Sequence, residues 1–149
     1  MEKRGQFYLI TAVIIIAIIL GFVAITNYYK TKSSVQINDL KKELEIESSE
    51  VLDYIIQNPE ADKLDEFTRD FSKYAGKEVE IIYITDASGD LEVYKYNEDS
   101  QKEIVPFTGT NSITIVSNNF EYEFGLTEGI DFYFIISQTI GGEHYVVTN

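Results

Sequence analysis

The chain opens on a long apolar run. The 19 residues of segment 7–25 carry no charge and are nearly all apolar. At about 1.5 Å per residue, a helix of that length spans roughly 28 Å, close to the hydrocarbon thickness of a bilayer. Tyr8 lies at one end and Tyr28 and Tyr29 at the other, where aromatic belts are found. The run therefore predicts one membrane-spanning helix over residues 6–29.

Two alternatives to that helix are weaker. A buried core helix needs surroundings that a chain of 149 residues can hardly supply. A cleaved secretory signal has an apolar region of about 7–15 residues before a small-residue cleavage site. Here the run is longer, and the Asn-Tyr-Tyr-Lys of residues 27–30 is a poor site.

Basic residues flank the run equally, with Lys3 and Arg4 before it and Lys30 and Lys32 after it. The free amino group favours a cytoplasmic N-terminus. We therefore expect a single-pass protein whose acidic part, residues 33–149, is extracytoplasmic.

The pattern then becomes amphipathic. Apolar residues recur at steps of three and four, which predicts a helical stalk over residues 30–57. The stripe consists of Ile37, Leu40, Leu44, Val51 and Ile55, with Ser48 filling the gap. No Pro or Gly interrupts residues 28–57, so the two helices form either one rod of about 50 residues or two helices joined flexibly at 31–34.

A second helix is expected over residues 59–75, at the start of a domain covering 58–149. Asn58 is a good N-cap and Pro59 suits the first helical position. An aromatic stripe follows, and Gly76 is a C-terminal stop. The stripe consists of Leu64, Phe67, Phe71 and Tyr74.

After Gly76 the hydrophobic period changes to two, which predicts strands. Three hairpins are expected, over residues 78–96, 112–126 and 130–148, with a further short strand at 104–105 in a polar loop. The fold class is α+β: a transmembrane helix, an amphipathic helix, a second helix and an antiparallel sheet of about six strands over 78–148. The residues expected in the core are Phe67, Phe71, Phe124 and Phe134.

Charge and composition exclude several functions. Twelve basic and 25 acidic residues give a net charge of -13, which disfavours nucleic-acid binding. The absence of Cys excludes disulfides and thiolate chemistry, and a single His excludes a multi-His metal site while only weakening a Ser-His-Asp triad.

Candidate chemistry is sparse. His144 lies beside a hairpin turn and is interpreted as a surface or cross-strand polar residue. The turn 86–90 resembles the start of a calcium loop, but position 12 from Asp86 is Asn97 rather than Glu. The acidic run 43–53 is interpreted as a solvated helix face. We therefore expect no enzyme activity, no metal and no cofactor.

The informative motif is Met-Glu-Lys-Arg-Gly-Gln at residues 1–6, directly before the apolar run. It resembles the start of archaeal type IV pilin-like proteins with a class III (prepilin) signal peptide. The resemblance implies a leader of residues 1–5, cut between Gly5 and Gln6 by a prepilin peptidase, and a pilin-like architecture. Some members carry Ser and Glu at the third and fifth mature positions, where this chain has Tyr8 and Ile10.

The resemblance implies a structural subunit of a surface filament or secretion apparatus, a minor pilin or pseudopilin-like protein. Its partners would be the membrane, the peptidase, and other copies or pilin-like subunits. Ala17, Gly21 and Ala24, at steps of four and three, form one small-residue face for helix packing. The alternative is a single-pass, membrane-anchored binding domain that does not polymerise.

Overall fold

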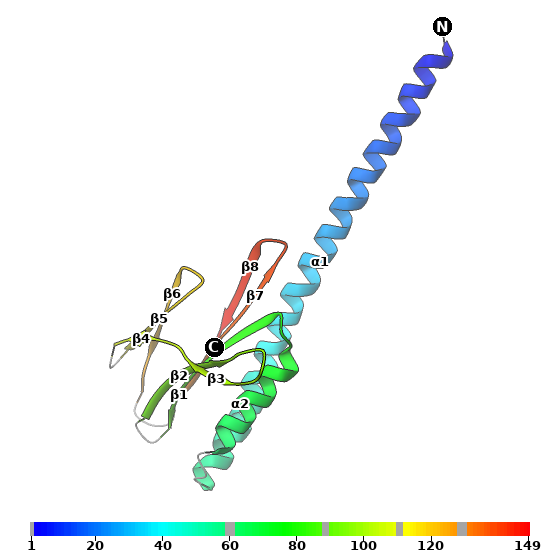
Figure 1. Cartoon of the computed structure of the whole chain (residues 1–149). Coiled ribbons are helices and arrows are strands. Elements are labelled where there is room, and N and C mark those ends of the chain that lie inside the picture. Colours follow the sequence, from blue (N-terminus) through cyan, green and yellow to red (C-terminus); the bar gives the residue numbers. More distant parts are fainter. Residues whose placement is uncertain (1, 59–61, 88–89, 110–111, 128–130) are drawn as a thin grey trace. The chain divides into compact units, whose positions relative to one another are not determined.

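The computed structural model describes residues 2–58, 62–87, 90–109, 112–127 and 131–149, with the side chains of 2–11, 26–35, 62, 87 and 90 not described. The chain divides into two units, Met1–Gln36 and Ile37–Asn149, which are considered separately below. The two helices, labelled in Figure 1, are α1 (Glu2–Gln57) and α2 (Asp62–Ala75). The strands are β1 (Val79–Ala87), β2 (Asp90–Tyr96), β3 (Lys102–Ile104), β4 (Phe107–Thr108), β5 (Ser112–Ser117), β6 (Phe120–Gly125), β7 (Asp131–Ile140) and β8 (Glu143–Thr148).

The predicted membrane-spanning helix is wrong. Across the part of the chain that the structure describes, no helix combines the length and apolar character that crossing a bilayer requires. The single-pass localisation over 6–29, with a cytoplasmic N-terminus and an extracytoplasmic acidic domain, is wrong for the same reason. α1 is helical through residues 31–34, where a flexible joint was the alternative.

The amphipathic half of α1 is confirmed. Ile37 and Leu44 are at most 1% exposed, and the whole predicted stripe faces the core of the unit 37–149. Ser48 is buried in the stripe, and its hydroxyl donates to the Glu45 carbonyl at 3.3 Å. A small polar side chain is tolerated there because the helix backbone itself supplies the acceptor.

α2 begins at Asp62, and Pro59, the predicted first residue of this helix, lies outside the described residues. Asn58 instead closes α1: its backbone and side-chain amides both donate to the Tyr54 carbonyl. Gly76 ends α2 with φ at +88°, a conformation that favours glycine. Leu64 and Phe71 on the predicted stripe are buried, whereas Phe67 is half-buried and Tyr74 is exposed.

The strands form two antiparallel sheets rather than one. The larger has the order β3-β2-β1-β7-β8, and the smaller has the order β4-β5-β6 (Figure 1). The three predicted hairpins are confirmed as β1-β2, β5-β6 and β7-β8. The prediction of one sheet of about six strands is wrong. The β5-β6 hairpin pairs with β4 and forms the smaller sheet. The β1-β2 and β7-β8 hairpins are joined by the pairing of β1 with β7 and form the larger sheet.

Two hydrophobic clusters make the unit 37–149 a three-layer structure. One cluster joins the helices to the larger sheet, through Tyr83 and Phe134 among others. The other joins the two sheets, through Ile84 and Ile115 among others. β1 and β7 are covered on both faces, which explains why their sequences read as nearly continuous apolar runs.

Hydroxyl groups fix α2 on the larger sheet. Thr68, which is fully buried, has its hydroxyl within 3.2 Å of the hydroxyls of both Tyr94 and Tyr96. One turn further along α2, Ser72 lies 2.9 Å from the Tyr83 hydroxyl. These contacts provide hydrogen-bond partners for the hydroxyls of the buried Tyr83 and Tyr94.

Candidate functional site

The predicted processing site lies in α1. The side chains of residues 2–11 are not described, so Gly5 and Gln6 carry no contacts that test cleavage between them. The leader prediction therefore stays a prediction.

The predicted packing residues Ala17, Gly21 and Ala24 lie in the described part of α1, and all three are exposed. A Cβ built on Gly21 would have no atom within 4 Å. This face is therefore available for close approach by another helix.

The large apolar side chains around this face are exposed as well. Each of those in residues 12–25 is at least 51% exposed, and Phe22 reaches 67%. They point in all directions around the helix, because no charged or strongly polar residue interrupts the segment. We call residues 12–25 the apolar segment. Exposed apolar surface of this extent marks an interaction site in folded proteins.

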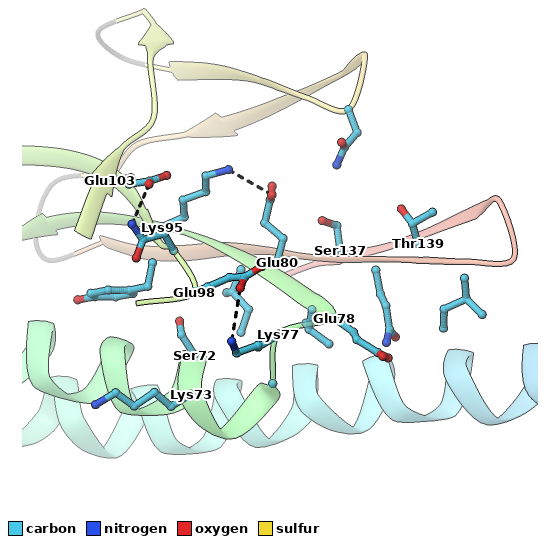
Figure 2. A pocket seen from close by; sticks show the side chains of 18 of the residues that line it. Ser72, Lys73, Lys77, Glu78, Glu80, Lys95, Glu98, Glu103, Ser137 and Thr139 are labelled. Carbon is cyan, nitrogen blue, oxygen red and sulfur yellow. Dashed lines mark hydrogen bonds and ion pairs between the residues drawn. The ribbon is translucent and has the colours of Figure 1, made fainter. Parts of the chain in front are cut away.

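A polar hollow of about 860 Å³ lies at one end of the larger sheet (Figure 2). Some of its charged groups are paired with one another. Lys95 Nζ lies 3.2 Å from the Glu80 carboxylate, and Lys77 Nζ lies 3.4 Å from Glu98. The Asn97 amide donates to Glu103 at 3.0 Å. Two of the four carboxylates that line the hollow thus form ion pairs with lysines that also line it.

His144 borders the hollow and is a cross-strand polar residue, as expected. It pairs with Thr139 across the β7-β8 hairpin, and its Nδ1 lies 3.0 Å from the Thr139 hydroxyl. Its ring stacks on Phe120 at 6.0 Å between centroids and an interplanar angle of 3°. The Nε2 atom is buried with no hydrogen-bond partner among the described residues. The ring contact links β8 to β6.

Among the described residues, no group of three or more His, Asp or Glu side chains is arranged so that it could hold a metal ion. Ala87 pairs with Asp90 in the β1-β2 register, so these two residues belong to the ends of the predicted first hairpin's strands.

Asp131 binds Thr127 in a contact that the sequence did not single out. Its carboxylate accepts from the Thr127 backbone amide at 2.7 Å and from the Thr127 hydroxyl at 2.6 Å. Asp131 is 7% exposed, and these bonds provide the partners that a buried carboxylate requires.

A second hollow, of about 680 Å³, lies between α1 and α2, and we call it the α1/α2 groove. It combines aromatic side chains with carboxylates. Its lining from α1 is Glu43, Glu47, Glu50, Val51 and Tyr54. Its lining from α2 is Lys63, Glu66, Phe67, Asp70, Phe71 and Tyr74.

The acidic face of α1 divides between this groove and solvent. Glu47 and Glu50 are exposed and line the groove, whereas Glu45 and Asp53 are exposed but do not line it. The sequence signal for the groove was the helical spacing, at steps of four, three and four, of Glu43, Glu47, Glu50 and Tyr54. It was missed because the same spacing is typical of a plain solvated face.

Comparison of the chain with protein-family models, curated proteins and solved structures gives no match. The geometry described above therefore carries the functional argument.

Proposed function

We propose that the chain is a structural subunit of a filament or secretion apparatus, and that it assembles with other copies or similar subunits through the apolar segment of α1. The observation that carries the proposal is the exposure of every large apolar side chain in residues 12–25. The resemblance of residues 1–6 to a prepilin leader agrees with it.

The energetic argument rests on apolar area. Burial of one large aliphatic side chain stabilises by about 1.5–3 kcal/mol. Ten such side chains are more than half exposed in the segment, so covering them supplies a driving force on the order of 10 kcal/mol. Because the exposed side chains surround the helix, several neighbouring helices are needed to cover them.

The small-residue face gives this assembly a closest contact. Ala17, Gly21 and Ala24 lie on one side of α1, and helix separation depends on the side chains at the contact. Ala12 lies on roughly the opposite side, about 150° around the helix from that face. Ala17 therefore provides the test position and Ala12 its matched control.

The test compares Ala17→Leu with Ala12→Leu in the full chain by sedimentation velocity. Overpacking a close contact costs about 1–3 kcal/mol. Ala17→Leu should therefore raise the concentration at half-assembly by about tenfold or more. Ala12→Leu adds the same side chain away from the close contact and should change the concentration at half-assembly by no more than about threefold.

Two results would count against the proposal. The first is a wild-type chain that stays monomeric throughout the concentration range. The second is an equal effect of the two substitutions, which would mean that the small-residue face is not the closest contact between helices. Mass spectrometry of the mature N-terminus in the native host tests the leader separately: a chain beginning at Gln6 supports it, and an intact Met1 contradicts it.

A further inference from the structure

The α1/α2 groove has an apolar floor that solvent reaches. Val51 and Phe67 are half-buried beside the buried Phe71, and Tyr54 and Tyr74 are 50% and 65% exposed. Phe67, Phe71 and Tyr74 form a continuous row, with ring centroids 6.0 and 5.8 Å apart. An aromatic row of this kind accepts the apolar face of a ligand.

The rim of the groove is strongly acidic. Five carboxylates and one ammonium group line it. Lys63 is paired with Glu66 at 3.2 Å, and Lys73 with Asp70 at 3.2 Å. Glu47 and Glu50, in contrast, form no ion pair with any described residue. Their charge is available to a cationic ligand.

One rim group is already held in place. The Glu43 carboxylate accepts a hydrogen bond from the Tyr74 hydroxyl, and this bond raises the pKa of Tyr74. Glu43 comes early in the groove-lining part of α1, and Tyr74 lies in the last turn of α2. The contact therefore shows that the two helices run antiparallel, α2 lying alongside α1 (Figure 1).

The dimensions fit a helix. The groove follows α1 from Glu43 to Tyr54, about 16 Å or three turns. Its lining residues on each helix recur at steps of three and four, the ridge pattern against which a third helix packs. Helix-in-groove recognition uses apolar anchors at the same steps.

Charge argues against a second copy of this chain as the occupant. The sequence has a net charge of -13, so most of its own surface would meet the acidic rim with like charge. We propose that the α1/α2 groove binds a cationic amphipathic helix of a different protein, with its apolar face on the aromatic row and its Lys or Arg side chains against Glu47 and Glu50. The inference is independent of the proposed function, because it concerns another surface and another partner.

The test uses the full chain tethered sparsely through a C-terminal tag, so that copies cannot meet and self-assembly does not affect the reading. The probe is a 14-residue peptide of Leu and Lys with all Leu on one helical face. A shuffled peptide of the same composition has no such face. Surface plasmon resonance should give binding of the first peptide that weakens as salt rises, and much weaker binding of the second.

The decisive variant is Glu47→Lys with Glu50→Lys. Its matched control is Glu121→Lys with Glu123→Lys on β6, two exposed residues of the sheet that lies away from the helices. Both pairs change the net charge equally. The groove pair should weaken peptide binding by about tenfold or more and the control pair by about twofold or less. Circular dichroism checks that each variant is folded.

A second variant tests the apolar contact without a charge change. Tyr54→Ser, at a half-exposed side chain, should weaken binding by about fivefold. Equal loss in the two charge-reversal pairs would show general attraction to an acidic protein and overturn the proposal. Equal binding of the shuffled peptide, or no binding of the amphipathic one, would also overturn it.

Discussion

The hydroxyl of Thr68 on α2 lies 3.2 Å from the hydroxyl of Tyr94 on β2, in a contact from which solvent is excluded. The Thr68 hydroxyl also donates to the Leu64 carbonyl at 3.0 Å. One side chain thus joins the backbone of α2 to the phenol groups of the larger sheet. This contact positions α2, and α2 in turn forms one wall of the α1/α2 groove.

Replacing Thr68 by Val should destabilise the protein by about 1–3 kcal/mol, because it leaves the buried Tyr94 hydroxyl without this partner. Urea unfolding measures the loss. Thr114→Val is the control, since Thr114 is half-buried in β5, where Val is a good strand former. Similar changes in the two variants would mean that the hydroxyl contact adds nothing to stability.

Alkaline pH should weaken the fold through Tyr83. Burial raises the pKa of this phenol well above its ordinary value of 10.0. The folded state therefore keeps the proton that the unfolded state loses, so the stability is fully present below about pH 10 and declines above it. Tyr83→Phe should make the decline above about pH 10 shallower, as measured by urea unfolding at each pH. Tyr54→Phe, at a half-exposed ring, is the control, and an unchanged slope in Tyr83→Phe would contradict the prediction.

Phe134 is fully buried between the larger sheet and the helices. Its replacement by Ala removes a whole ring from a packed core and should cost about 3–5 kcal/mol. Phe120→Ala makes the same chemical change at a ring that is 56% exposed and should cost much less. Thermal or urea unfolding of both variants gives the comparison, and equal losses would place the core elsewhere.

Self-association through the apolar segment should strengthen as salt is added. The net charge of -13 opposes bringing copies together, and about 0.15 M salt reduces the range of that repulsion to roughly 8 Å. Sedimentation velocity at low and moderate salt measures the effect. Peptide binding in the α1/α2 groove should show the opposite dependence, so the two interactions are distinguishable. Stronger assembly at low salt would mean that ion pairs between subunits dominate.

Short-range patterns predicted most of the elements. The stripe from Ile37 to Ile55 identified the inner face of α1, including the buried Ser48, because helical periodicity repeats over one or two turns. Asn118-Asn119 and Gly141-Gly142 identified two hairpin turns, and all four residues have positive φ. Of the four Phe residues expected in the core, Phe71, Phe124 and Phe134 are buried and Phe67 is half-buried.

The wrong predictions concern the membrane-spanning helix and the pairing of the strands. Hydropathy over segment 7–25 predicts a membrane-spanning helix, whereas the described part of the chain has no helix able to cross a membrane. The division into two sheets was missed because strand pairing depends on contacts between distant residues. Ile82 on β1, for example, has Lys95 as its partner on one side and Ile135 on the other.

The sequence by itself determined which residues form helices and hairpins, the inner face of each, and the acidic character of the surface, because local periodicity, turn chemistry and charge do not depend on the rest of the fold. Only the tertiary structure decided that β1 pairs with β7, and that the sheets stack so that Tyr83 faces the helices while Ile84 faces the smaller sheet. It also decided that Glu47 and Glu50 of α1 share a groove with Tyr74 of α2. These relationships join residues far apart in the chain, and they are fixed by which apolar faces cover one another.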